Sequence, residues 1–367
     1  GAAVEKAFGE KVRADNLRVA GYPSIEPKDG AAEGTLEFTA VFEVYPDVVV
    51  GEFAGRKIER PVLNVGDAEV DKTIEVLRKQ RTGFKAVERA AAAGDRVVID
   101  FTGRMDGEVF DGGQAQDFPF VVGAGSMLKD FEDAVVGLAA GEGKTFDMTF
   151  PEDYHAANLA GKQVQFEITV KAVEEPVLPE VDADFARSLG VADGDVAKLR
   201  EEVKGNLERE VKRRIQSRLK EQVMDALIEV APIDVPKALV QAESNQLADN
   251  ARRDLEMRGL KTKDIPVDPS WFKDQAERRV KLGLIMAELV KASELHAKPE
   301  QIRALVEEMA QSYEDPSELV RWYYAQPERL AQAEAVVIED NVVEWVCAKA
   351  DTSDKEVAFD ELMGNAA

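Results

Sequence analysis

The chain of 367 residues is too long for one ordinary hydrophobic core, so two or more domains are expected. Its apolar fraction of 45% excludes a mainly disordered polypeptide, and its formal charge of −24 argues against binding to nucleic-acid phosphates. No run of about 18 apolar residues occurs, so neither a membrane span nor a membrane partner is expected. The single cysteine, Cys347, rules out an internal disulfide and fits a reducing compartment; its apolar helical context predicts a buried thiol.

The near-neutral N-terminal part differs from the segment that follows it. Residues 1–92 carry 16 acidic and 14 basic side chains, whereas residues 93–175 carry 16 and 6. Residues 1–50 are predicted to form a short helix and then two strands, the second within "GTLEFTAVFEVYP". These elements bury too little surface to stand alone, which suggests the back half of a domain. The start at Gly1 instead of methionine is expected of a processed or trimmed polypeptide.

Residues 51–92 are predicted to be a connector that contains one helix. Val70, Ile74 and Leu77 recur at helical spacing, with Asp67 in position to cap the helix N-terminus. The stretch "AAAAGD" then separates this connector from a strand-rich region.

Residues 93–175 are predicted to form a small α+β domain. The stretch "DRVVIDFTGRMDGEVFDGG", from Asp95, predicts a β-hairpin with a turn rich in Asp and Gly. Apolar and polar residues alternate in "KTFDMTFP" and "VQFEITVKAV", which is typical of an antiparallel sheet with one solvent-exposed face. Between these stretches a short helix, ended by Gly141, is predicted to have one apolar face made of Leu128, Phe131, Val135 and Leu138.

After the Pro-rich and acidic stretch "EEPVLPEVDADF", the chain is predicted to be helical. From Leu199 to Leu227 an apolar residue recurs at every fourth position, and each such step drifts by about 40° against a 3.6-residue turn. This stripe winds around the helix, so the helix must contact different neighbours along its length, as an extended arm would. Further helices are predicted at roughly 236–259, 269–295, 299–313 and 316–350.

The signatures of common catalytic and metal sites are missing from the sequence. His155 and His296 lack the Cys or carboxylate spacing of a zinc site, and "VVGAGSML" lacks the lysine and the spacing of a phosphate-binding loop. Aromatic residues are instead concentrated in the strand-rich region. Within 66 residues lie Phe101, Phe110, Phe118, Phe120, Phe131, Phe146, Phe150, Tyr154 and Phe166. Core packing is the better interpretation of Phe120, Phe146 and Phe150, whereas the residues flanking the hairpin turn also suit an apolar binding surface.

Several segments carry a resemblance to known families. "VVIDFTGRMDGEVFDGG", "FVVGAGSMLKDFEDAVVGLAAGE", "FPEDYHAANLAGK" and "VQFEITVKAVE" together resemble FKBP-type peptidyl-prolyl isomerases in order and spacing. "VFEVYPDV", "LRKQ", "AQSYEDP" and "FDELM" extend the resemblance to the trigger factor family of bacterial ribosome-associated chaperones, over essentially the whole chain.

The resemblance implies a multidomain α+β fold with four parts. Residues 1–50 would be the C-terminal part of an α/β ribosome-binding domain, and residues 51–92 a linker with a helix. Residues 93–175 would form an FKBP-like antiparallel half-barrel sheet around one helix. Residues 176–367 would form an extended all-α C-terminal chaperone domain with arms.

The implied function is that of an ATP-independent, cytoplasmic chaperone that cradles nascent or unfolded chains and isomerises X–Pro peptide bonds. Neither a cofactor nor a metal is expected. The family's docking loop, of Gly-Phe-Arg-x-Gly-Lys type, has no counterpart in this sequence. Ribosome docking is therefore expected of the intact protein but not of this chain, no direct nucleic-acid role is expected, and a homodimer is left open. Two alternatives are a dedicated prolyl isomerase whose helical region selects folded partners, and a scaffold with an inactive isomerase fold.

The resemblance also implies the residues of the isomerase site. The catalytic set would be Phe101, Asp111, Leu128, Phe131, Tyr154 and Phe166, and the substrate-binding set Phe110, Met127 and His155. In the helical region Met224, Met257, Met286 and Met309 suit either packing between helices or adaptable contacts with clients. Client contacts are therefore expected of the region and are not assigned to single residues.

Overall fold

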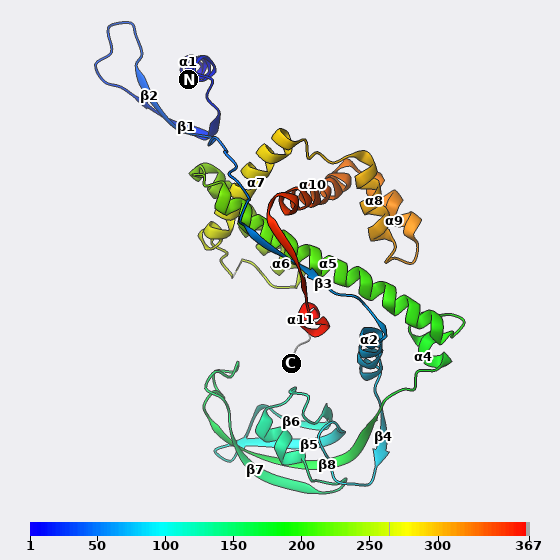
Figure 1. The fold of residues 1–367 in the computed structure, drawn as a ribbon. Helices are drawn as coiled ribbons and strands as arrows, with labels where there is room; N and C mark the ends of the chain where they lie inside the picture. The colour runs from blue at the N-terminus through cyan, green and yellow to red at the C-terminus, as the bar shows by residue number, and fades with distance from the viewer. Residues whose placement is uncertain (264, 365–367) are drawn as a thin grey trace. The chain divides into compact units, whose positions relative to one another are not determined.

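The computed structural model describes residues 1–263 and 265–364, which divide into two compact units (Figure 1). The sheet unit comprises Val65–Leu207, and the helical unit comprises Gly1–Asn64 together with Glu208–Ala367. Each unit has its own cluster of buried apolar residues. Both kinds of structure predicted from the sequence, a strand-rich part and a helical part, are present.

A five-stranded antiparallel sheet dominates the sheet unit. Its strand order is β4-β8-β5-β6, and β7 also pairs with β8. The strands are β4 (Gly83–Val87), β5 (Arg96–Met105), β6 (Glu108–Val121), β7 (Gly143–Thr149) and β8 (Gln163–Val177). The predicted hairpin is confirmed as β5 and β6. The sheet also reaches outside the range 93–175, because β4 pairs with Val173–Val177.

The predicted alternation along β8 is confirmed. Val164, Phe166, Ile168 and Val170 are buried, while the residues between them face solvent. The helix α3 (Lys129–Val135) contributes Phe131, Ala134 and Val135 to the same core. The prediction that this helix extends to Gly141 is wrong. Val136 is already extended and Gly137 has a φ of 90°, a left-handed conformation that ends the helix.

Two further helices of the sheet unit differ from expectation: one has a different N-cap residue, and the other was not predicted. In α2 (Asp67–Gln80) the residue that precedes the first turn is Gly66, whose N–H is 2.8 Å from Glu69 Oε2. The prediction of Asp67 as the N-cap is therefore wrong by one position. A short helix, α4 (Ala183–Ser188), was not predicted in the acidic hinge; Asp182 caps it by accepting a hydrogen bond from the Phe185 N–H at 3.0 Å.

The predicted long helix with a winding stripe is α5 (Val196–Val230), and the boundary between the units falls within it. Its apolar positions from Leu199 to Leu227 are buried or half-buried. Its partners change along its length, as expected. Within the sheet unit Arg200 lies 2.8 Å from Asp71 of α2, whereas within the helical unit Lys220 pairs with Glu339.

The N-terminal segment of the helical unit contains one helix and two strands, as predicted. These are α1 (Ala2–Ala14), β1 (Val19–Pro27) and β2 (Phe38–Val44), with β1 and β2 antiparallel. The ring of Phe8 on α1 lies 5.2 Å from that of Phe42 on β2, at 80°, and this edge-to-face contact joins the helix to the hairpin.

The rest of the helical unit is mainly α-helical. Its helices are α6 (Lys237–Met257), α7 (Lys273–Ser293) after the 3₁₀ turn η1 (Pro269–Phe272), α8 (Pro299–Ala310), α9 (Pro316–Tyr324), α10 (Pro327–Lys349) and α11 (Phe359–Met363). The single helix predicted over 316–350 is wrong. Pro327 has no N–H to continue a preceding helix and instead begins α10.

The helical unit is not entirely α-helical after residue 176. The strand β9 (Asp351–Glu356) pairs in parallel with β3 (Lys57–Val62), which lies in the predicted linker. The side-chain amide of Gln222 on α5 completes this arrangement. It accepts a hydrogen bond from the Glu59 N–H at 2.9 Å and donates one to the Glu59 carbonyl at 2.7 Å.

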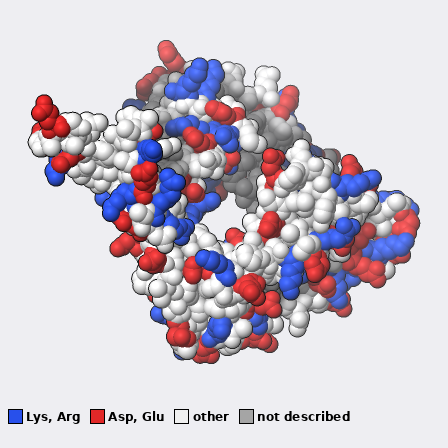
Figure 2. All heavy atoms as spheres, turned by 90° about the horizontal axis from the view of Figure 1, so that it is seen from above, with Lys and Arg blue, Asp and Glu red and all other residues white. Residues whose placement is uncertain are grey.

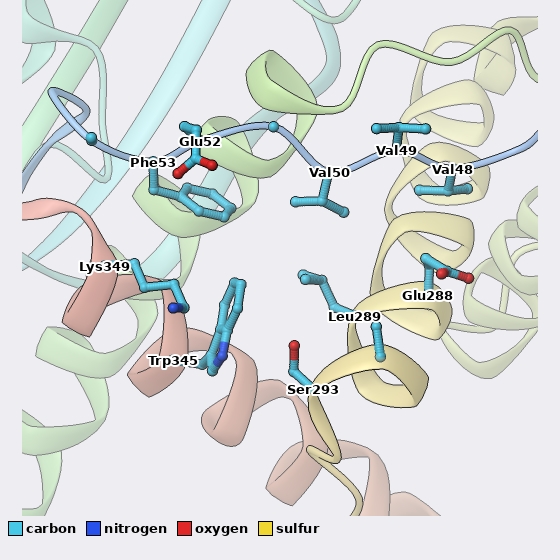
Figure 3. A pocket seen from close by; sticks show the side chains of 13 residues that line it. Val48, Val49, Val50, Glu52, Phe53, Glu288, Leu289, Ser293, Trp345 and Lys349 are labelled. Atoms are coloured by element: carbon cyan, nitrogen blue, oxygen red, sulfur yellow. The ribbon is translucent and has the colours of Figure 1, made fainter.

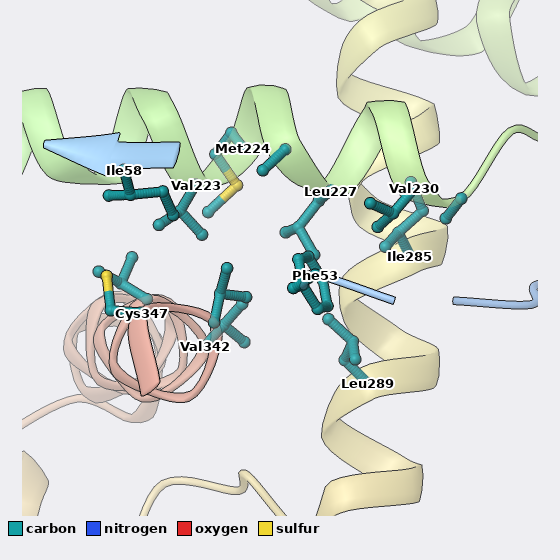
Figure 4. Packing of buried hydrophobic residues seen from close by; sticks show 14 of the residues in the cluster. Phe53, Ile58, Val223, Met224, Leu227, Val230, Ile285, Leu289, Val342 and Cys347 are labelled. Carbon is teal, nitrogen blue, oxygen red and sulfur yellow. The ribbon is translucent and has the colours of Figure 1, made fainter. Parts of the chain in front are cut away.

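The core of the helical unit lies where α5, α7 and α10 meet, shown in Figure 4. Val223 and Leu227 of α5 are fully buried there, with Ile285 of α7 and Val342 of α10. Residues 1–64 contribute Phe53 and Ile58, and Cys347 is also buried, as predicted. Other members of this core are Met224, Val230, Leu289, Val343 and Val346. In the described residues no helix is long and apolar enough to cross a membrane.

Charged side chains of both signs are interspersed on the face shown in Figure 2. The formal charge of −24 is therefore not gathered into one acidic patch on that face.

Candidate functional site

One pocket of the sheet unit, with a cavity of about 470 Å³, is lined by all nine residues predicted for the isomerase site. They come from β5, β6, the loop before α3, α3 itself, the segment between β7 and β8, and β8. In that order they are Phe101, Phe110, Asp111, Met127, Leu128, Phe131, Tyr154, His155 and Phe166. The volume lies in the range of ordinary small-ligand sites.

Three phenylalanine rings form the floor of this pocket. The rings of Phe131 and Phe166 lie 5.2 Å apart at 89°, and those of Phe101 and Phe131 lie 5.5 Å apart at 84°. Phe131 and Phe166 are buried, whereas Phe101 is half-buried. Edge-to-face contacts of this kind add about 0.5–1.5 kcal/mol each beyond the burial of area. The floor is therefore an apolar surface whose three rings pack edge to face.

A bulge of four residues in β6 explains how both Phe110 and Asp111 can line the same pocket. Thr102 pairs with Gln114, but Arg104 already pairs with Val109, so four residues of β6 stand opposite Gly103 alone. In a regular strand, neighbouring side chains point to opposite faces. The bulge breaks this alternation and lets two consecutive residues line one cavity.

The opposite wall consists of the segment between β7 and β8. The Tyr154 ring lies 4.7 Å from that of Phe150 and 4.2 Å from that of His155. Phe150, which was assigned to core packing, is buried and also lines the pocket. His155 and Asp111 are exposed, so the polar groups of the site lie at its rim.

The loop before α3 supplies Met127 and Leu128, both half-buried. The Leu128 carbonyl accepts hydrogen bonds from the N–H groups of Phe131 and Glu132, each at 3.0 Å, and so begins the helix. Glu132, buried within α3, accepts a hydrogen bond through Oε2 from the Gly123 N–H at 3.1 Å. This contact fastens the other end of the loop, and no motif in the sequence indicated it.

Several lining residues were missed by the sequence analysis: Gly112, Gly125, Ser126, Met148, Ala156 and Leu159. Gly125 and Ser126 lie in "VVGAGSML", directly before the predicted site residues Met127 and Leu128. Met148 lies on β7, and the others lie in the β6 bulge or in loops, where periodicity gives no signal.

An ion pair fixes the chain at the start of β5. Arg89 donates hydrogen bonds to both carboxylate oxygens of Asp95, at 2.6 and 2.9 Å, and the Ala92 N–H donates to Oδ2 at 2.9 Å. These bonds, led by those from Arg89, hold the pKa of the buried Asp95 carboxyl below its usual range. In the residues that the structure describes, no group of three or more His, Cys, Asp or Glu side chains is arranged to hold a metal ion.

The helical unit contains a second hollow of about 550 Å³, shown in Figure 3. The extended segment 48–54 forms one side, and α7 and α10 form the others. The Trp345 ring lies 5.7 Å from that of Phe53 at 90°, and Lys349 Nζ lies 4.9 Å above the Trp345 ring. Glu288 and Ser293 add polar groups, so the lining is polar and apolar in nearly equal parts.

The four methionines singled out in the helical region differ in exposure. Met224 is buried in the core of the helical unit, and Met286 and Met309 are half-buried. Met257, at the end of α6, is 86% exposed, so it is the one of the four that is available for contact.

Comparison with known proteins covers most of the chain. The models of the bacterial trigger factor protein match residues 1–77 and, for its C-terminus, residues 195–348. A model of FKBP-type peptidyl-prolyl cis-trans isomerases matches residues 87–171, which contain the nine-residue pocket. A trigger factor from Aromatoleum aromaticum is 76% identical over all of this chain and 85% of its own length. The chain belongs to the trigger factor family.

A second curated relative agrees with this assignment. A trigger factor from an Azoarcus species is also 76% identical, over all of this chain and 84% of its own length. A solved structure of the trigger factor chaperone is 16% identical, covers 94% of this chain and 82% of its own, and has a TM-score of 0.45. As a trigger factor, the chain is a chaperone with an FKBP-type peptidyl-prolyl cis-trans isomerase domain. Family membership implies binding of nascent or unfolded polypeptides and of the ribosome.

Proposed function

We propose that the nine-residue pocket is the isomerase site, because residues from six separate segments converge on one apolar cavity. The edge-to-face floor of Phe101, Phe131 and Phe166 would grip the proline ring of an X–Pro peptide. Leu128 and Met127 would cover it from the loop before α3. Phe110 and His155 would contact the residues next to proline.

The reaction needs a lower barrier to rotation and no bond cleavage. Amide resonance sets that barrier at about 18–20 kcal/mol in water. The planar amide is more dipolar than the twisted one, so an apolar cavity that excludes water favours the twisted state relative to water. Each 1.36 kcal/mol removed from the barrier is about a tenfold gain in rate. Phenylalanine rings suit this task because they bind proline without solvating the amide dipole.

Asp111 and Tyr154 are the polar residues of the proposed catalytic set. Asp111 lies on the exposed bulge of β6, and Tyr154 presents a phenol whose ring is held between Phe150 and His155. We assign the Tyr154 hydroxyl to donate a hydrogen bond to a peptide carbonyl and the Asp111 carboxylate to accept one from the backbone N–H of a residue next to the proline. Both groups would orient the peptide without transferring a proton.

A matched pair of substitutions tests this site. Phe131→Leu and Phe120→Leu both alter a buried phenylalanine of the same core, but only Phe131 lines the pocket. We expect similar losses of thermal stability, together with a fall in kcat/KM on a short X–Pro peptide for Phe131→Leu alone. Equal activity in the two folded variants would contradict the assignment.

We also propose that clients are held by the helical unit, through residues 208–367 of the predicted domain 176–367 together with segment 48–54. Two observations support this region: the hollow between segment 48–54, α7 and α10, which offers both apolar and polar groups, and exposed apolar side chains such as Met257 and Trp271. The full chain should be compared with the sheet unit, residues 65–207, on a short X–Pro peptide and on an unfolded protein whose refolding is limited by proline. Equal action on the peptide, with only the full chain effective on the protein, is expected. Equal action on both substrates would favour a dedicated isomerase.

Three expectations stay predictions. Co-sedimentation with ribosomes tests whether this polypeptide fails to dock by itself, and analytical ultracentrifugation tests for a homodimer. The single buried thiol of Cys347 supports a reducing location such as the cytoplasm, which fractionation of cells tests.

A further inference from the structure

Two buried glycines enclose the ring of Phe110. Gly103 on β5 is the residue that stands opposite the four-residue bulge of β6, and Gly113 is the last of those four residues. A Cβ atom at Gly103 would lie 2.7 Å from Phe110 Cε1, and a Cβ at Gly113 would lie 2.8 Å from Phe110 Cε2. The ring therefore occupies the space that two side chains would otherwise fill.

Backbone geometry does not require glycine at either position. Neither Gly103 nor Gly113 has a positive φ, whereas their neighbour Gly112 has a φ of 76°. An L-amino acid could adopt the backbone of both without strain, but its Cβ would overlap the ring of Phe110. These two positions are thus limited by the aromatic ring and not by the turn.

Two further aromatic rings pack edge to face against the enclosed ring. Its centroid lies 5.9 Å from that of Phe166 at 83°, and 6.1 Å from that of Phe150 at 83°. Phe166 is part of the pocket floor, and Phe150 supports Tyr154 on the opposite wall. The Phe110 ring therefore contacts both the pocket floor, through Phe166, and the wall that contains Tyr154, through Phe150.

We propose that Gly103 and Gly113 are positioning residues of the isomerase site, which act by holding the Phe110 ring out of the cavity; this inference rests on the site proposed above. With either glycine replaced, the ring moves away from the strands, and the open space on its other side is the cavity. The shifted ring occupies volume that the peptide needs. Peptide binding is weakened although no group that contacts the peptide has been removed.

Gly113→Ala is the more specific test of the two substitutions, because it affects the Phe110 ring alone. The atoms closest to a Cβ at Gly113 all belong to Phe110, whereas a Cβ at Gly103 would also lie 2.6 Å from Phe166 Cε1. Gly83→Ala is a matched control on β4 of the same sheet. Gly83 has no positive φ, and its Cβ would meet only the Val177 carbonyl oxygen, at an ordinary 3.8 Å.

The experiment measures kcat and KM on a short X–Pro peptide, in the full chain, for Gly113→Ala, Phe110→Ala, the double variant and Gly83→Ala. Because a displacement of about 1 Å in a site can cost about 100-fold, we expect Gly113→Ala to lower kcat/KM by about 10- to 100-fold. The loss should lie mainly in KM, since the cavity is narrowed for substrate and transition state alike. Gly83→Ala should behave as the parent chain does.

The double variant separates positioning from a general structural role. Phe110→Ala removes every ring atom that an alanine at Gly113 would meet, so adding Gly113→Ala to it should cause no further loss. Should Gly113→Ala alone fail to fold, the same double variant is expected to fold again. Additive losses, a double variant that stays unfolded, or unchanged kinetics in Gly113→Ala would each overturn the inference.

The failure of this inference is distinguishable from the failure of the isomerase site itself. If Phe131→Leu lowers activity while Gly113→Ala does not, the pocket stands and the glycine role is wrong. If Phe131→Leu is as active as Phe120→Leu, the site assignment fails whatever the glycine variants do, and the positioning role falls with it.

Discussion

Replacing Phe166 by leucine should destabilise the sheet unit and leave the helical unit unchanged. Phe166 is 5% exposed, and its ring packs against the rings of Phe101, Phe110, Phe131 and Phe146. Such pairs add about 0.5–1.5 kcal/mol each, so four of them contribute about 2–6 kcal/mol. Leucine keeps much of the apolar volume and recovers part of this. We therefore expect the free energy of unfolding of the sheet unit to fall by about 2–4 kcal/mol.

Differential scanning calorimetry of the full chain measures this loss. For a unit of about 140 residues, 1 kcal/mol corresponds to about 3–4 °C in Tm, so a fall of roughly 10 °C is expected in one transition. The transition of the helical unit should stay in place, because its buried cluster shares no residue with that of Phe166. Phe84→Leu on β4, outside the aromatic cluster, is the control. Equal shifts of both transitions would refute the reasoning that the two cores are independent.

Three other perturbations give distinct outcomes. Leu227→Ala, at a fully buried position of α5, should destabilise the helical unit by about 2–5 kcal/mol and leave the isomerase activity on a short peptide unchanged. A lowered activity on the peptide, in a variant whose sheet unit unfolds at the parent temperature, would contradict this. Because the pKa of Asp95 is lowered in the folded chain, its stabilising effect is complete above about pH 4 and is lost as the pH falls through the folded pKa. Asp95→Asn should therefore flatten the acid-side loss of sheet-unit stability, and an unchanged slope in acid titrations followed by circular dichroism would show that Arg89 contributes nothing. Burial raises the pKa of the Cys347 thiol, so a disulfide reagent should react slowly with the native chain at neutral pH and quickly after denaturation; fast native labelling would disprove the burial.

Local pattern was enough to predict the elements whose faces are clearly divided. The alternation of Val164, Phe166, Ile168 and Val170 marks one buried face of β8, and the spacing of Val223 and Leu227 marks the buried side of α5. The residues of the isomerase site could not be predicted from such patterns. Its nine residues were chosen by family resemblance, because no periodicity distinguishes a pocket phenylalanine such as Phe131 from a core one.

Elements that are stabilised mainly by residues far away in the sequence were not predicted. β9, "DTSDKE", has no apolar alternation, and its partner β3 lies almost 300 residues away in the chain. Its pairing depends on backbone hydrogen bonds and on surface ion pairs such as Lys355 with Glu59, at 3.3 Å. The break before α10 could have been found, since Pro327 is visible in the sequence. The bulge opposite Gly103 could not, because register is a property of two strands.

The sheet unit is an insertion between the two halves of the helical unit, and this governs the order in which the polypeptide can fold during synthesis. All five strands of the sheet have been made once Val177 has emerged, so this unit can form while translation continues. Phe53 and Ile58 are made much earlier than their core partners Val342 and Cys347. The α5 members of this core can cover those early apolar residues only in part, and the core is complete only when nearly the whole chain has been made. A protein that protects unfinished chains therefore passes through the same exposed stage during its own synthesis.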